Sequence, residues 1–259
     1  MGRLNWATAA WPLSRPFLQP FWAWKSATTT SGKPGKLIRS FAKLLLQLLH
    51  NPQIQPCPYD PASNWWGASD ASAHPDDGAY IGGWIADCEN PSKGQTWWFH
   101  YKIPLEDHPW AHKDGDPTRR IATLEMFGTL ILTHFLLALG GKSLLRTRLS
   151  LISDNQGNVF ALLNQKTKHM PTSAFLMQLI AMLYVAGVQL APSHMKRDYN
   201  KWADELTHPN FTGFHPDRQL PVSEAFSHFK FLWALLDDQM SVPTFSGNSK
   251  RRKTDSHAT

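Results

Sequence analysis

An aspartate follows an apolar run in the stretch LSLISDNQGNVFALLN, residues 149–164. The run from Leu149 to Ile152 is typical of a buried strand, and the pattern around Val159 is typical of a helix. Asp154, at the junction, has two interpretations. It caps the following helix, or it holds a charged group at the carboxyl edge of a sheet, where open α/β sheets bind their ligands. The second interpretation requires more acids at the same edge.

Three further acids occupy positions that an apolar framework makes unusual. Asp70 ends or interrupts a strand-like run, Glu125 lies near the start of a long apolar helix, and Asp204 lies in a helical segment beside Trp202 and Leu206. Each has a simple explanation alone. The first could start a turn, the second could favour the positive end of a helix, and the third could pair with a cation.

The four acids together favour a metal site. Carboxylates in an apolar framework lose solvation and repel one another, so each is costly unless a cation joins them. Ligands that are all oxygen select Mg²⁺, with Mn²⁺ as the alternative. Two such ions about 3.5–4 Å apart can hold both the attacking and the leaving oxygen of a phosphoryl displacement, which accounts for several carboxylates. The predicted metal ligands are Asp70, Glu125, Asp154 and Asp204.

The order of the predicted elements indicates a fold class. Three strand-like runs separated by turn residues suit antiparallel pairing, and the alternation of helix and strand that follows suits βαβ connections. We expect a mixed five-stranded α/β sheet, three antiparallel strands followed by βαβ units, flanked by helices. The expected strands are 65–73, 79–87, 96–105, 149–152 and 188–194, and the expected helices are 121–139, a short one after the fourth strand, 172–186 and 200–208.

Four segments carry these acids: SDASAHPDDGAYIGGWI, ATLEMFGTLI, LISDNQGNVFALLN and HMKRDYNKWADELTH. In this order they resemble the successive motifs of ribonuclease H, and most closely those of retroelement reverse transcriptases of the DIRS type. The resemblance covers about residues 64–208 and includes the order Asp, Glu, Asp, Asp on strand, helix, strand and helix. The last motif is the most specific, because His194, Asn200 and Asp204 follow one another at intervals of six and four residues.

The resemblance implies a ribonuclease H-like fold and a metal-dependent cut of the RNA strand in an RNA–DNA hybrid. Asp70 would bridge two ions. Glu125 and Asp154 would hold the ion on the leaving-group side, and Asp204 would complete the ion that activates water. His194 would assist proton transfer or product departure at the rim, although a surface histidine that ends a strand is the simpler alternative.

Residues that flank the acids are the predicted substrate contacts. A hybrid duplex displays 2′-hydroxyls in a wide, shallow minor groove, and these groups distinguish RNA from DNA. Asn200 would brace its loop at the edge of the substrate site. The side chains expected to contact the substrate beside the acids are Ser69, Ser72, Asn155 and Gln156. Phosphate contacts, with solvated surface as the alternative for each, could come from Lys166, Lys168, His169, Lys196 and Arg197.

The composition favours polyanionic partners such as nucleic acid or an anionic membrane. The 259 residues are 42% hydrophobic and carry a net charge of +6 with a pI of about 9.3, which suits a polyanion. Two cysteines without C-x-x-C spacing predict no disulfide framework, and the N-terminus lacks the apolar stretch of a signal peptide. We expect an intracellular protein, nuclear or cytoplasmic, with no membrane partner.

Three regions are predicted along the chain. Residues 1–60 combine a segment at 2–24, which resembles the part that closes the thumb of such polymerases, with a basic helix and a proline-rich linker. Residues 61–209 form the ribonuclease H-like domain. Residues 210–259 form a C-terminal extension, with an apolar stretch at 226–236 expected to dock as a helix and a disordered basic tail that contains KRRK. The resemblance therefore implies a polymerase part of the same element as a further partner.

Rival functions fit the acids less well. Transposases and integrases end their acid series with Glu, whereas Glu comes second here, and proofreading exonucleases carry Asp-x-Glu where this chain has Asp70, Ala71 and Ser72. The serious alternative is a decayed element whose domain keeps the fold and binds nucleic acid, or has a structural role, without cutting. The presence of all four acids argues against loss of activity by substitution of an acid, but does not by itself establish an open site.

Overall fold

The computed structural model describes residues 15–18, 21, 39, 42–43, 45–46, 50, 60–167, 169–230, 232–233 and 236. The predicted thumb-like segment, the basic helix that follows it and the linker fall almost wholly outside these residues. The KRRK tail lies outside them altogether.

Five strands form one mixed sheet in the order β3-β2-β1-β4-β5. β1 pairs antiparallel with β2 and β2 with β3, whereas β4 runs parallel to both β1 and β5. This arrangement confirms the ribonuclease H-like fold class predicted from the sequence. The strands are β1 (Ala62–His74), β2 (Gly78–Ala86), β3 (Trp97–Ile103), β4 (Arg148–Ser153) and β5 (Gln189–His194).

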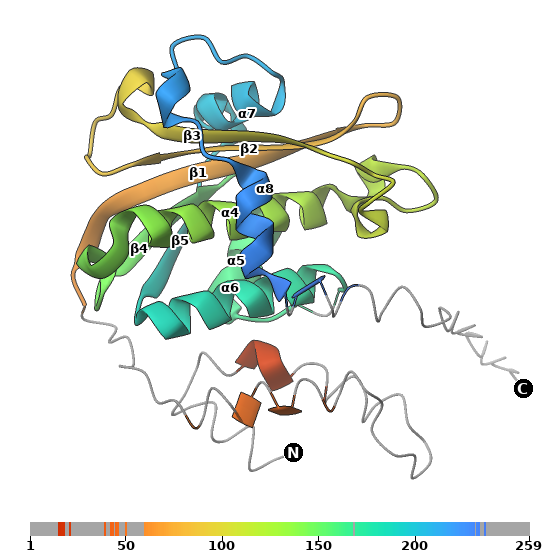
Figure 1. Cartoon of the computed structure of the whole chain (residues 1–259), viewed down its shortest axis with the longest axis vertical. Helices are drawn as coiled ribbons and strands as arrows, with labels where there is room; N and C mark the ends of the chain where they lie inside the picture. Colours follow the sequence, from red (N-terminus) through yellow and green to blue (C-terminus); the bar gives the residue numbers. More distant parts are fainter. Residues whose placement is uncertain are drawn as a thin grey trace, which may run out of the picture.

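Helices cover both faces of the sheet (Figure 1). α4 and α6 lie on one face, α7 lies on the other face against β1 and β2, and α5 follows β4. The helices predicted at 121–139, 172–186 and 200–208 correspond to three of these elements. The bounds are α4 (Ile121–Gly140), α5 (Gln156–Asn164), α6 (Thr172–Ala186), α7 (Lys201–Thr207) and α8 (Val222–Ala225).

α4 is the central helix of the core because it is apolar on nearly every side. It packs against β1, β2 and α6, and Leu130, Ile131 and Leu132 are all fully buried although they face different directions. Within the described residues, one helical stretch, Pro117–Leu144, has the length and apolar composition to cross a membrane. Of its apolar window, 67% is buried inside the protein, as in the core helix of a folded domain.

α7 lies very close to the opposite face of the sheet, and Gly82 permits this approach. A Cβ at Gly82 would lie 2.7 Å from the backbone carbon of Leu206 and 2.8 Å from the amide nitrogen of Thr207. A second apolar cluster that includes Trp84 and Ala203 fills this interface. Because Gly82 is the partner of Asp70 in the sheet, the approach brings α7 next to that aspartate.

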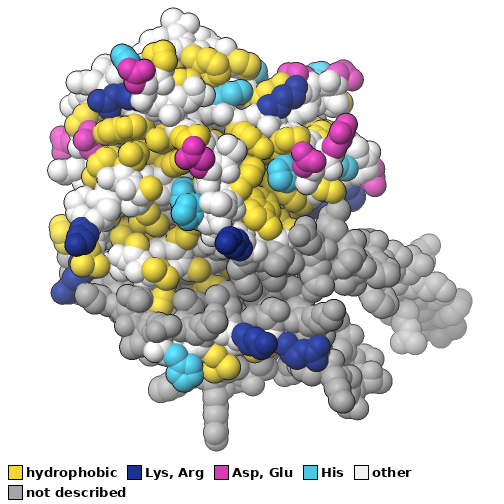
Figure 2. Space-filling model, viewed as in Figure 1, with side chains coloured by type: hydrophobic (Ala, Val, Ile, Leu, Met, Phe, Trp, Pro, Cys, Tyr) yellow, Lys and Arg dark blue, Asp and Glu magenta, His cyan; other side chains and the backbone are white. Residues whose placement is uncertain are grey.

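The C-terminal extension packs on the same core. In the segment predicted to dock as a helix, 226–236, the described residues Lys230, Leu232, Trp233 and Leu236 are helical. The separate short helix α8 and a 3-10 turn at Phe226–His228 come before them. Phe229 and Leu232 are fully buried. On the face seen in Figure 2, hydrophobic side chains are spread over much of the described surface, with charged side chains and histidines among them. The described part of the extension therefore belongs to the fold of the predicted domain.

Candidate active site

Parallel pairing of β1 and β4 brings two of the acids together. Asp70 lies inside β1, opposite Gly82, and neither ends the strand nor starts a turn. Ala68 pairs with Ile152, so the next positions along the two parallel strands lead to Asp70 and to Asp154 side by side. Asp154 therefore lies at the carboxyl end of β4, next to Asp70, as the sequence led us to expect.

α4 supplies the third acid. Glu125 is the fifth residue of α4, and Gly128 lies one turn further on. A Cβ at Gly128 would lie 3.5 Å from the carbonyl oxygen of Asp70, an ordinary contact distance, so α4 packs directly on β1 beside that aspartate. A cavity of about 280 Å³ results, and its lining includes Asp70, Ser72, Glu125, Asp154, Arg197 and His208.

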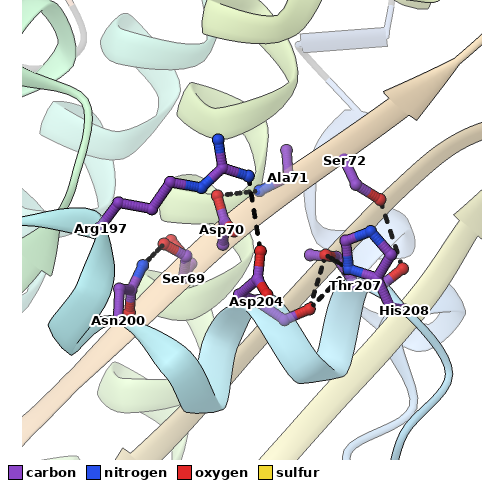
Figure 3. Close-up of polar contacts among 9 residues, drawn as sticks. All are labelled: Ser69, Asp70, Ala71, Ser72, Arg197, Asn200, Asp204, Thr207 and His208. Carbon is purple, nitrogen blue, oxygen red and sulfur yellow. Dashed lines mark hydrogen bonds and ion pairs between the residues drawn. The ribbon is translucent and has the colours of Figure 1, made fainter.

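Asp204, from α7, faces the same group but is engaged by a cation. Its Oδ1 lies 3.5 Å from Nη2 of Arg197, and its side chain is 39% exposed. Figure 3 shows the Arg197 side chain reaching across Asp70 toward Asp204. The alternative in which Asp204 pairs with a cation is therefore realised in this structure, and the cation lies in the acidic cavity.

Burial and neighbouring negative charge raise the pKa values of two of the acids. Burial and the charge of Asp154 raise the pKa of Asp70 to about 7, against an ordinary 3.8. Burial also raises the pKa of Glu125 to about 8, against an ordinary 4.5, with further contributions from the charges of Asp154 and Asp70. Such shifts mark places where carboxylates lack a compensating positive charge.

The donors present fit a divalent cation. Oδ1 of Asp154 is buried and has no hydrogen-bond partner among the described residues, as expected for an oxygen that awaits a ligand. The carboxylates that line the cavity offer only oxygen, which suits Mg²⁺ or Mn²⁺. As the side chains lie, however, no group of three or more His, Cys, Asp or Glu residues in the described chain is arranged to hold a metal ion. Binding would therefore require side-chain rotations, including that of Asp204 away from Arg197.

The helix cap after β4 is Asn155 and not Asp154. The side chain of Asn155 accepts a hydrogen bond from the amide of Asn158 at 3.0 Å, which satisfies the first turn of α5. Asn158, which is buried, donates in turn to the carbonyl of Ala122 at 2.9 Å and to Glu125 at 3.4 Å. The capping interpretation of Asp154 is thus excluded, and Asp154 is left free for another role.

The predicted residues of the last motif surround the acids. His194, the final residue of β5, is exposed, and its Nε2 lies 3.1 Å from the carbonyl oxygen of Asp154. Asn200 is 2% exposed, and its amide donates to the carbonyl of Ser69 at 3.4 Å. Asn200 therefore braces the start of α7 against β1 and does not offer its side chain to a bound duplex.

The expected substrate contacts divide between surface and core. Ser72 lines the cavity, Gln156 is exposed, and Asn155 is half-exposed beside Glu125. Ser69 is the exception, since it is 4% exposed and its hydroxyl lies 3.5 Å from that of Thr129 on α4. The prediction that Ser69 contacts the substrate is wrong for this structure, because alternation along β1 turns it into the core when Asp70 faces the site.

His208 is a cavity residue that the sequence argument did not single out. Its Nδ1 lies 3.0 Å from the carbonyl oxygen of Asp204 and 3.1 Å from the hydroxyl of Thr207. The sequence could have indicated His208, because residues four apart on a helix share a face and His208 follows Asp204 by four positions.

A second cavity of about 560 Å³ adjoins the first. Arg119, Arg120 and His169 line it, together with Asn155. Nε of Arg120 is buried and has no partner among the described residues, while its Nη1 donates to the carbonyl of Met170 at 3.3 Å. The cavity therefore offers one unsatisfied donor, on Arg120, whereas Arg119 is paired with Asp114 and Asp116. Of the other predicted phosphate contacts, Lys166 and Lys196 are exposed and Lys168 lies outside the described residues.

Comparisons with known proteins give matches only among solved structures. No protein-family model and no curated protein matches the chain. The LC11 ribonuclease H1 in complex with an RNA/DNA hybrid has 21% identity and a TM-score of 0.42, over 57% of this chain and 96% of that one. The ribonuclease H1 of the halophilic archaeon Halobacterium salinarum has 14% identity and a TM-score of 0.40, over 56% and 96%. The prototype foamy virus protease-reverse transcriptase has 13% identity and a TM-score of 0.36, over 62% of this chain and 22% of that one.

Proposed function

We propose that this chain is a metal-dependent endonuclease that cuts the RNA strand of RNA–DNA hybrids. The observation that carries the proposal is the convergence of Asp70, Glu125 and Asp154 on one cavity, with a buried carboxylate oxygen that has no partner among the described residues. Asp70 in β1, Asp154 directly after β4 and Glu125 in α4 repel one another, so their proximity lowers the stability of the fold. This cost favours a role in binding a cation.

The residues that would hold Mg²⁺, or Mn²⁺, are Asp70, Glu125, Asp154 and Asp204. When bound, a pair of such ions would stabilise the charge on the attacking and leaving oxygens of the phosphodiester. Asp204 would have to rotate from Arg197 to take part, and Glu125 would have to release its proton.

The chain supplies a proton carrier at the rim. His194 is exposed at the end of β5, beside the backbone of Asp154, so its imidazole can exchange protons with solvent and with a group in the cavity. We propose that it assists proton transfer or product departure.

Substrate binding would use both cavities. Ser72 at the acidic cavity and Gln156 on the adjoining surface can offer polar side chains to 2′-hydroxyls. Arg120 and His169 in the second cavity would take a backbone phosphate, which should make binding fall with salt. The same reasoning makes an RNA–DNA hybrid the proposed partner.

The wider context is also proposed. The retroelement resemblance, most specific to the DIRS type, suggests that the domain works with a polymerase part of the same element inside the cell, in the nucleus or the cytoplasm. Co-purification of the chain with that polymerase would test this association. Failure to associate would leave the nuclease proposal untouched.

The nuclease proposal is tested with a hybrid labelled separately on each strand, in Mg²⁺ and in EDTA. The wild type should cut only the RNA strand and only with metal. Asp154→Asn should lose more activity than the roughly 10–100-fold that loss of an outer contact costs. Asp76→Asn, at a side chain that is 93% exposed, is the matched control and should cleave normally.

Two outcomes would overturn the proposal. The first is equal cleavage by wild type and Asp154→Asn. The second is hybrid binding by both proteins without cleavage by either, which would favour the non-enzymatic alternative.

A further inference from the structure

Arg197 occupies the acidic cavity in a way that the sequence did not suggest. It was a candidate phosphate contact, yet its guanidinium lies 3.5 Å from Asp204 and its side chain lines the cavity with Asp70, Glu125 and Asp154. Of the residues that line this cavity, Arg197 is the one with a permanent positive charge. It therefore supplies the countercharge that the acids otherwise lack.

The backbone of Arg197 is fixed while its side chain is free to leave. Its carbonyl accepts a hydrogen bond from the amide of Asn200 at 2.9 Å, and the buried Asn200 is itself tied to the carbonyl of Ser69. The side chain, in contrast, is 72% exposed. The backbone of Arg197 is thus held beside β1, while its exposed guanidinium can move into or out of the cavity (Figure 3). We call such a side chain a tethered cation.

We propose that Arg197 is a tethered cation that occupies the carboxylate site in the metal-free protein and is exchanged for a divalent ion. This inference rests on the proposed function, because the same acids would hold the ion. Asp204 cannot turn toward an ion while it faces Arg197, and two cations so close together would repel each other. The ion pair stabilises the metal-free state, so it raises the metal concentration needed to fill the site.

Metal titrations without nucleic acid test the exchange. Calorimetry with Mg²⁺, and Mn²⁺ binding followed by electron paramagnetic resonance, would be compared for wild type, Arg197→Ala and Arg197→Lys. We expect Arg197→Ala to bind metal up to about 5-fold more tightly, the range set by one largely exposed ion pair. Arg197→Lys, which keeps the charge, should stay within about twofold of wild type.

Lys196→Ala is the matched control, because Lys196 is an exposed cation next in sequence that does not line the cavity. It reports the general effect of removing one positive charge and should change metal affinity by less than Arg197→Ala. If the two alanine variants tighten binding equally, or if Arg197→Ala binds metal as wild type does or more weakly, the exchange does not occur.

Thermal unfolding adds a readout that a merely structural arginine would not produce. Arg197→Ala should lower the unfolding temperature in EDTA, yet gain a larger increase than wild type when Mg²⁺ is added. A loss of the same size with and without metal would contradict the proposal.

Metal affinity and hybrid cleavage, measured on the same proteins, separate failure of this inference from failure of the proposed function. If wild type cleaves hybrids but Arg197→Ala leaves metal affinity unchanged, only the tethered-cation proposal falls. If Arg197→Ala tightens metal binding but no variant cleaves, only the nuclease proposal falls. If no variant binds metal, both fall.

Discussion

At the scale of single residues, two acids of the cavity have raised pKa values. Burial raises the pKa of Glu125 to about 8 and the pKa of Asp70 to about 7. Metal binding must displace these protons, so the apparent affinity for Mg²⁺ should increase as the pH rises from 6 to about 8. The raised pKa values are a cost of the site and not a contribution to the stability of the fold.

Glu125→Gln should therefore stabilise the metal-free protein at alkaline pH. Glu125 releases its proton near pH 4.5 when unfolded and near pH 8 when folded, so between these values the folded state binds more protons. The free energy of unfolding of the wild type should fall as the pH rises through this window. At pH 8.5 the variant should be more stable by about 1–2 kcal/mol, after allowance for partial exposure.

Urea unfolding in EDTA at pH 5 and pH 8.5 measures this difference. Glu89→Gln, at an exposed acid, is the control and should keep the pH dependence of the wild type. If Glu125→Gln keeps the same pH dependence of stability as the wild type, folding does not raise the pKa of Glu125.

At the scale of elements, the site depends on how closely two helices approach β1. α4 packs on β1 and carries Glu125, while α7 lies very close to β2 at Gly82, the partner of Asp70, and carries Asp204. Each helix thus delivers one acid to the aspartate of β1. A small change in either spacing would separate the carboxylates by more than a shared ion tolerates.

Gly82→Ala should push α7 off the sheet. The new Cβ would lie 2.7–2.8 Å from backbone atoms of Leu206 and Thr207, which cannot rotate away. We expect a loss of about 2–3 kcal/mol in the free energy of unfolding and weaker metal binding, measured by denaturation and calorimetry. Gly94→Ala, whose Cβ would meet only the carbonyl of Gly213 at 3.7 Å, should change both quantities little. Equal effects of the two substitutions would contradict this account of α7.

At the scale of the whole molecule, the C-terminal segment completes the domain. The backbone amide of Leu220 donates to the carbonyl of Trp98 on β3 at 2.7 Å, which ties the segment to the edge of the sheet. Val222, Phe229 and Leu232 then enter the core that α4 organises. The boundary predicted after residue 209 is still a prediction about domains, but the described residues beyond it are part of one core.

A chain that ends at residue 219 should therefore be unstable. Each buried side chain that it lacks contributes about 1.5–3 kcal/mol, and together they approach the stability of an ordinary domain. We expect precipitation, or a lower unfolding temperature with strong binding of the dye ANS. A chain that ends at residue 240 keeps the packed segment and should unfold as the full chain does. Equal unfolding temperatures for the two truncations would contradict the role of the segment.

The sequence by itself determined the element order, the fold class and which acids to examine, because periodicity and turn residues are local signals. It also indicated that Asp154 follows a strand directly. Tertiary structure alone decided that Ser69 turns into the core and that Arg197 lies among the acids. These outcomes depend on strand register, on the distance between helix and sheet and on a turn after β5. Such features arise from contacts between residues far apart in the chain, which local patterns do not encode.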